Sequence, residues 1–164
     1  MKNKKVLFLT QAAMIAALYV VLTFLANAFG LASGVIQVRL SEMLAILPSF
    51  PPAAIPGVYL GCVLANLLTG GCLLDILLGS LASLIGALGA YLLHKNMWLI
   101  PLPTILANAI IVPFVLIFGY GVPDMWWYLV LTVGAGEVIS CGILGMVLLF
   151  ALKKHAARIF GTSR

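Results

Sequence analysis

Charge is scarce in this sequence. Of its 164 residues only 8% are charged, while 64% are hydrophobic, whereas about a quarter of the residues of a soluble domain are charged. A soluble protein of this length would lack the polar residues needed to cover its surface, so the composition indicates a membrane protein. At about 20 apolar residues per crossing, the chain has room for five or six spans and none for a large soluble domain.

Catalytic machinery is equally sparse. The three cysteines, Cys62, Cys72 and Cys141, match no zinc or redox spacing and are interpreted as packing residues. His94 and His155 each lie beside a lysine at the predicted membrane edge. No Ser–His pair at membrane depth, metal-ligand cluster or phosphate-binding glycine loop is found, so we expect neither an enzyme nor a cofactor.

Six apolar segments predict an all-α bundle of six transmembrane helices that forms a single domain over residues 1–164. Prolines and glycines separate the segments, since proline cannot continue a helix interior. The second segment is the shortest and the most polar. The predicted helices are 6–29, 35–47, 53–68, 74–93, 98–118 and 125–152, followed by a basic tail at 153–164.

The distribution of lysine and arginine predicts the orientation. With the N-terminus inside, eight of the nine basic residues fall in cytoplasmic segments, as the positive-inside rule requires. They do not alternate with aromatic residues, so the net charge of +5 does not indicate nucleic-acid binding. We therefore expect a multi-pass protein of a bacterial cell membrane with both termini in the cytoplasm. The eight are Lys2, Lys4, Lys5, Lys95, Lys153, Lys154, Arg158 and Arg164.

Ionisable residues within apolar segments need a reason, because each costs about 2.5–3.5 kcal/mol at the centre of a bilayer. Arg39 and Glu42 are three residues apart and are predicted to pair on one helix face, for structure or for a ligand. Asp75 lies at the start of the predicted helix 74–93, and Asp124 precedes the helix 125–152, so capping is the simplest interpretation of both. Glu137 lies deep in the last helix, where capping does not apply, and predicts a role with a ligand, a proton or a buried partner such as Arg39.

Asn66 and Asn108 lie within two further predicted helices. Their side-chain amides could form hydrogen bonds between helices, or they could bind a flat heterocycle, because an amide offers both donors and an acceptor. Together these polar residues predict a pocket that opens to the outside. We expect Trp126, Trp127 and Tyr128 to line it, and no comparable polar site in the cytoplasmic half.

Small residues recur along the first helix as Ala12-xxx-Ala16 and Ala13-xxx-Ala17. Such spacing lets helix backbones approach closely in lipid. Packing inside the bundle and docking of another membrane subunit both fit, and spacing alone favours packing.

Several motifs between residues 6 and 95 occur together in order. The alanine-rich residues 11–19 resemble the first helix of S components, the substrate-binding subunits of energy-coupling factor (ECF) transporters. The other motifs resemble the QueT family of queuosine-precursor transporters, and the similarity is weak after residue 95, where Glu137 stands out. These motifs are residues 37–44, 47–48, 54–62 and 65–67, Asp75, and residues 79–82.

The resemblance implies an importer subunit that binds its substrate from outside. A transmembrane coupling subunit and two ATPases would drive release inside, and Ala12, Ala13, Ala16 and Ala17 would form the docking face. The implied substrate is a 7-deazaguanine base such as preQ1 or preQ0.

For such a base we expect Glu137 at the guanine-like edge, because two N–H donors can face two carboxylate oxygens. Glu42 or Asp75 would make the second contact, and Trp126, Trp127 or Tyr128 would stack on the ring. The alternatives are an S component for another vitamin, such as riboflavin, folate or thiamine, and a membrane scaffold without a ligand.

Overall fold

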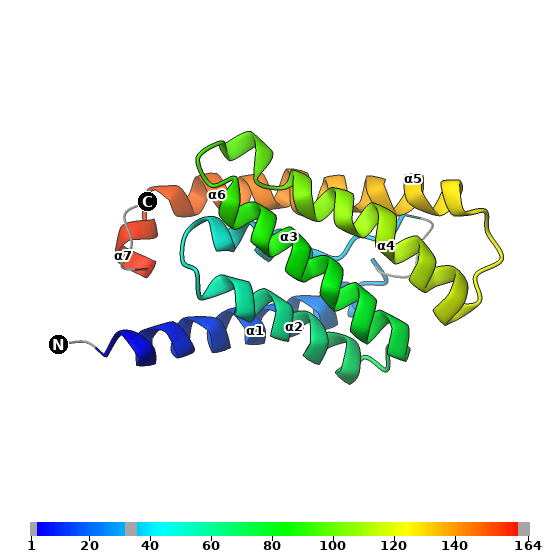
Figure 1. Cartoon of the computed structure of the whole chain (residues 1–164), viewed down its shortest axis with the longest axis horizontal. Helices are drawn as coiled ribbons and strands as arrows, with labels where there is room; N and C mark the ends of the chain where they lie inside the picture. The colour runs from blue at the N-terminus through cyan, green and yellow to red at the C-terminus, as the bar shows by residue number, and fades with distance from the viewer. Residues whose placement is uncertain (1–2, 32–35, 161–164) are drawn as a thin grey trace.

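A computed structural model describes residues 3–31 and 36–160, and its regular elements in this part of the chain are all helical (Figure 1). Two segments, η1 and η3, are 3₁₀-helices, and two, η2 and η4, are π-helices. The order is α1 Lys4–Ala28, η1 Leu40–Ser49, α2 Ala54–Leu68, η2 Asp75–Gly79, α3 Ser80–Leu92, η3 Met97–Leu99, α4 Leu102–Tyr120, α5 Trp126–Glu137, η4 Val138–Leu144, α6 Gly145–Lys153 and α7 Ala156–Phe160.

Four continuous helical runs of the described chain are long and apolar enough to cross a membrane. They are Lys4–Ala28, Asp75–Leu92, Met97–Tyr120 and Trp126–Lys153. The remaining two predicted segments form shorter apolar helices, η1 and α2. The helical character of all six segments is thus confirmed, and the four long runs fit a multi-pass membrane protein.

The second predicted helix differs most from expectation. Instead of an α-helix over 35–47, the chain forms a 3₁₀-helix that begins at Leu40 and contains Pro48. Pro48 lies in the last turn of this helix and has no N–H group to donate there. Arg39 precedes this helix in extended backbone. The predicted start of this helix at residue 35 lies outside the described residues.

The predicted basic tail is partly structured. Residues 156–160 form α7, which folds back onto the bundle because Phe160 stacks on Phe50 with ring centroids 5.8 Å apart. The amide of Gln11 in α1 also donates a hydrogen bond to the Phe160 carbonyl oxygen at 3.1 Å. Lys2 and residues 161–164, including Arg164, lie outside the described residues.

Helices α1 and α2 pack along a seam of small residues. A Cβ atom added at Gly57 would lie 2.9 Å from the Ala12 carbonyl oxygen, and one added at Gly61 would lie 3.1 Å from the Ala16 Cα. Ala12 and Ala16 are accordingly buried. The close approach of two backbones at small residues is typical of helix pairs in lipid.

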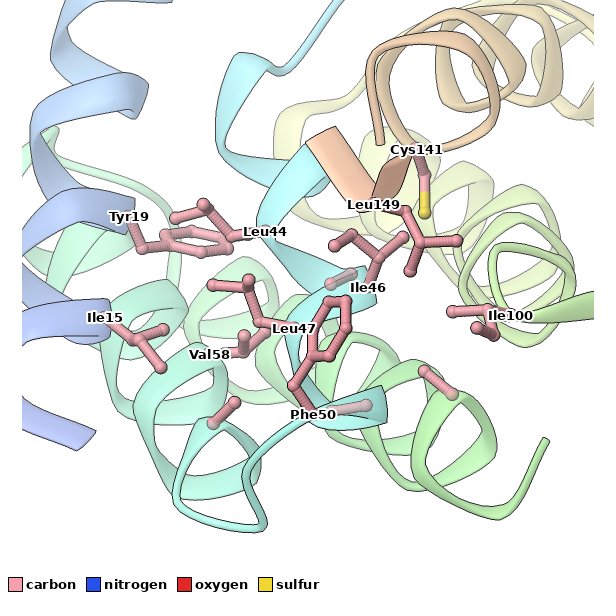
Figure 2. Packing of buried hydrophobic residues seen from close by; sticks show 14 of the residues in the cluster. Ile15, Tyr19, Leu44, Ile46, Leu47, Phe50, Val58, Ile100, Cys141 and Leu149 are labelled. Atoms are coloured by element: carbon pink, nitrogen blue, oxygen red, sulfur yellow. The ribbon is translucent and has the colours of Figure 1, made fainter. Parts of the chain in front are cut away.

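The core lies around η1, which runs between the α1–α2 pair and α6 (Figure 2). Ile46 and Leu47 of η1 are almost fully buried, and Ile15, Val58 and Leu149 reach them from three α-helices. The short second helix is therefore the central element of the packing.

The beginning of α1, the α3–η3 turn, the end of α6 and α7 lie toward one end of the molecule, at the left of Figure 1. We call this the basic end, because it contains Lys4, Lys5, Lys95, Lys153 and Lys154. The ends of α1, α2 and α4 and the start of α5 lie at the opposite end.

Candidate functional site

A cavity of about 400 Å³ opens at the end opposite the basic end. This volume falls within the range of about 300–1,000 Å³ that is common for small-molecule sites. The second half of α1, the segment before η1, the end of α2 and the end of α4 form its walls. The lining residues are Tyr19, Thr23, Ala26, Asn27, Gln37, Arg39, Ser41, Asn66, Thr69, Gly70, Gly71, Asp75, Leu116, Tyr120 and Val122.

Asp75 is the charged centre of this wall. One carboxylate oxygen, Oδ2, accepts a hydrogen bond from the Tyr120 hydroxyl at 2.8 Å and faces Arg39 Nη2 at 3.9 Å. The other oxygen, Oδ1, is buried and has no hydrogen-bond partner. The predicted Arg39–Glu42 pair is therefore wrong. Arg39 precedes its helix in extended backbone, so the spacing of three residues does not place it on Glu42's face.

Local backbone geometry positions the Asp75 side chain. Asp75 begins the π-helix η2, and π-helical turns are often found at functional sites. A Cβ atom at Gly79 would lie 2.6 Å from Asp75 Oδ1, so a larger residue there would displace the carboxylate from this position. Asn66 Nδ2 donates to the Asp75 carbonyl oxygen at 3.1 Å and ties α2 to this turn.

Neither aspartate makes a capping hydrogen bond, although Asp75 lies in the first turn of η2, where its charge complements the helix N-terminus. Asp124 is exposed, and Met125 occupies the N-cap position of α5 without a side-chain hydrogen bond. The Asp75 carboxylate instead joins three segments that are distant in the sequence.

A second polar group lies behind Tyr19. The Tyr19 hydroxyl donates a hydrogen bond to Glu42 Oε1, and Ser83 Oγ lies 3.5 Å from the same oxygen. The Asn108 side chain lies near both Glu42 and Glu137. Both glutamates are buried, and each has an Oε2 atom without a hydrogen-bond partner. We call Glu42, Asn108 and Glu137 the inner carboxylate group.

The predicted tryptophans do not line this cavity. Trp126 is 42% exposed and packs against Phe114, with ring centroids 5.8 Å apart. Trp127 is 58% exposed, and its indole donates to the Met125 sulfur at 3.2 Å. Tyr128 lies in a neighbouring cavity of about 390 Å³ beside Asp124. The aromatic walls of the site are Tyr19 and Tyr120 instead.

A further cavity, of about 600 Å³, lies at the basic end. The expectation of no comparable polar site in this half is therefore wrong. Hydrophobic periodicity could not reveal this cavity, because its lysines come from a turn and a helix end that are far apart in the sequence.

Comparison with known proteins identifies the family. A family model described as QueT transporter matches residues 9–154, which include every residue that lines the 400 Å³ cavity. The chain belongs to the QueT transporter family. QueT members are transporters, so this chain is placed among transport proteins and not among enzymes.

One curated QueT relative supports this membership. The queuosine precursor transporter QueT of Lactococcus lactis subsp. cremoris is 35% identical over 85 residues, which are 52% of this chain and 50% of the relative. The matched segment thus spans half the length of that relative. No solved structure matches the chain.

The predicted QueT site residues fall into three sets. Arg39, Asn66 and Asp75 line the cavity, whereas Glu42, Asn108 and Glu137 lie behind its Tyr19 wall. Trp126 and Trp127 belong to neither set.

The sequence analysis did not identify Tyr19, Gln37 or Tyr120 as residues that line the cavity. Tyr19 carried a usable signal, since it ends the stripe Ala12, Ile15, Ala16 and Tyr19 and places a hydroxyl on a buried face. Tyr120 gave no signal, because its contact with Asp75 joins residues 45 positions apart.

The four alanines predicted to form the docking face fall into a buried pair and an exposed pair. Ala12 and Ala16 are buried in the α1–α2 seam, so they cannot form an outer docking face. Ala13 and Ala17 lie on the exposed side of α1, flanked by Met14, Leu18 and Val21, which are 50–60% exposed. Only this second pair is open to a partner.

Proposed function

We propose that this chain is the substrate-binding S component of an ECF-type importer and captures a queuosine precursor, a 7-deazaguanine base such as preQ1 or preQ0. One observation carries the proposal: three buried carboxylates lie at or directly behind the cavity, and each has an oxygen without a hydrogen-bond donor. The atoms are Asp75 Oδ1, Glu42 Oε2 and Glu137 Oε2.

Buried acceptors without donors favour a ligand rich in N–H groups. Leaving such a group unpaired costs about 1–3 kcal/mol, and more when it is charged. The guanine-like edge of a 7-deazaguanine offers adjacent N–H donors that match a carboxylate, and the aminomethyl group of preQ1 adds a cation. Only one described cation, Arg39, faces the cavity among these carboxylates. A basic, donor-rich heterocycle therefore complements the site.

The ligand would meet the two polar groups in succession. Asp75 and Arg39 are reached directly from the cavity, with Tyr19 and Tyr120 as the aromatic surfaces for stacking. Glu137 and Glu42 lie behind Tyr19, so contact with the base edge requires the Tyr19 hydroxyl to leave Glu42. In this proposal Asp75 makes the first contact, and Glu137 completes recognition of the base.

The proposed topology has six membrane segments with both termini inside. The four long helices span the bilayer, and the shorter η1 and α2 complete the bundle. The positive-inside rule then assigns the basic end to the cytoplasm and turns the 400 Å³ cavity outward. An outward-facing binding site is what an import subunit needs. Release into the cell would depend on a coupling subunit and two ATPases that dock on α1.

The test is ligand-induced stabilisation of the purified chain. We expect preQ1 or preQ0 to raise the unfolding free energy by about 2.7 kcal/mol at a hundred times the dissociation constant, and guanine to raise it less. Asp75→Asn should lose most of this shift, because it removes the charge that faces the cavity. Asp124→Asn, which changes an exposed acid at the same end, is the matched control. A shift with riboflavin, folate or thiamine instead would assign a different substrate, and no shift with any ligand would contradict the proposal.

A further inference from the structure

The cavity at the basic end lies between the end of η1, the α3–η3 turn and α6. It has a volume of about 600 Å³ and combines basic with apolar walls. No residue that lines it belongs to the 400 Å³ cavity. Its lining residues are Ser49, Phe50, Tyr91, His94, Lys95, Met97, Ile100, Leu149 and Lys153.

None of the basic groups of this cavity forms an ion pair with an acidic side chain in the described part of the chain. His94 and Lys95 come from the α3–η3 turn and Lys153 from the end of α6, so packing brings them together. The four aspartates and glutamates of the sequence, Glu42, Asp75, Asp124 and Glu137, all lie elsewhere. The hydrogen bond of Lys153 Nζ goes to the Met97 sulfur at 3.1 Å, which is a weak acceptor. No acidic side chain of the described residues supplies a negative charge at this position.

The remaining walls are apolar and continue onto the outer surface. Ile100 and Leu149 form a buried floor. Trp98 is 77% exposed and contacts Phe150 edge-on, with ring centroids 6.0 Å apart. Phe150 lies three residues before Lys153 and is 47% exposed. The surface therefore places a cationic recess beside an apolar strip, whose two residues belong to two helical runs that are each long enough to cross a membrane.

We infer that this cavity binds the headgroup of an anionic phospholipid, such as phosphatidylglycerol. The lipid phosphate lies between Lys95 and Lys153, and an acyl chain follows the Trp98–Phe150 strip. Basic pockets between membrane helices on the cytoplasmic side are suited to such headgroups. The apolar strip favours a lipid over a soluble anion, because it can contact an acyl chain. Inorganic phosphate has no acyl chain.

The experiment compares lipids on the purified full chain in a neutral detergent. We expect short-chain phosphatidylglycerol to raise the melting temperature, while the matching phosphatidylcholine and inorganic phosphate leave it unchanged. Lys95→Gln with Lys153→Gln should weaken the apparent affinity for phosphatidylglycerol by about 25-fold, because each lysine near an anionic lipid contributes about fivefold. Lys4→Gln with Lys5→Gln removes the same charge from the same end, outside the cavity, and should weaken it far less.

Native mass spectrometry gives a second measurement, which tests lipid preference even if the Lys95→Gln, Lys153→Gln variant does not fold. The wild-type chain and the Lys4→Gln, Lys5→Gln variant should each retain phosphatidylglycerol in preference to phosphatidylcholine. Equal retention of both lipids would overturn the inference. So would an undiminished phosphatidylglycerol shift in the Lys95→Gln, Lys153→Gln variant, or a shift of equal size with inorganic phosphate alone.

Discussion

The sequence was enough to single out Glu137 as a functional candidate, but not to show where its side chain lies relative to the cavity. Its carboxylate in an apolar helix predicted a functional or buried role, and the structure buries it beside Asn108. The Tyr19 wall in front of it could not be predicted, because Tyr19 and Glu42 meet only through packing of α1 on η1. Composition identified most of the polar groups, and long-range contacts decide which of them face the cavity.

Replacing Glu137 with Gln tests its proposed contact with the base. The substitution keeps the shape but exchanges an acceptor oxygen for an N–H donor, so we expect binding to weaken about 10- to 100-fold, as for the loss of a charged hydrogen bond. Calorimetry on the purified chain measures this change. Ser140→Ala, which removes a buried hydroxyl without a partner three residues later, should leave affinity unchanged. Unaltered binding by Glu137→Gln would contradict the proposed role.

The helices themselves were largely predictable from apolar runs, and their irregular turns were not. Segments 6–29 and 53–68 agree closely with α1 and α2. The π-helices η2 and η4 begin at or directly after an acidic residue, Asp75 and Glu137 respectively. Hydrophobic periodicity carries no signal for such turns, because the same residues could continue an α-helix.

Gly136 in α5 controls the position of the segment before η1. A Cβ atom there would clash with the Gln37 carbonyl oxygen, whereas one at Gly134 meets only Ala109 at 3.7 Å. Gly136→Ala should therefore displace Gln37 and destabilise the protein by about 1–3 kcal/mol. Because Gln37 lines the cavity, ligand affinity should fall as well.

Gly134→Ala is the matched control for this change. It should leave both properties nearly unchanged or slightly stabilise α5, since alanine is the better helix former by about 1 kcal/mol. Thermal unfolding with and without ligand measures both variants. Equal behaviour of the two would show that the contact between α5 and Gln37 does not shape the cavity.

The molecule as a whole has two distinct ends, and the sequence indicated this through its lysines. The described chain is all-helical, as predicted, with four runs long enough to cross a membrane. The central position of η1 and the return of α7 over the basic end were not predicted. The outer face of α1 has no partner among the described residues along Ala13 and Ala17. The small residues alone could not show which alanine pair faces inward, because both pairs have the same spacing.

Ala17→Trp tests this face as the docking site for the proposed coupling subunit. The larger side chain would hold the partner helix away, so co-purification with the coupling subunit and ATPases should be lost while ligand binding persists. Leu106→Trp on α4, at a position 52% exposed, is the control and should preserve the complex. If both variants assemble equally well, docking occurs elsewhere.

The placement of the tryptophans also determines how binding can be observed by spectroscopy. Trp98, Trp126 and Trp127 all lie outside the 400 Å³ cavity, and each is more than 40% exposed. A bound base would touch none of them, so their emission would report the surrounding detergent or lipid rather than occupancy. A fluorescent readout of this cavity requires either its own tyrosines, Tyr19 and Tyr120, or a reporter placed in its wall.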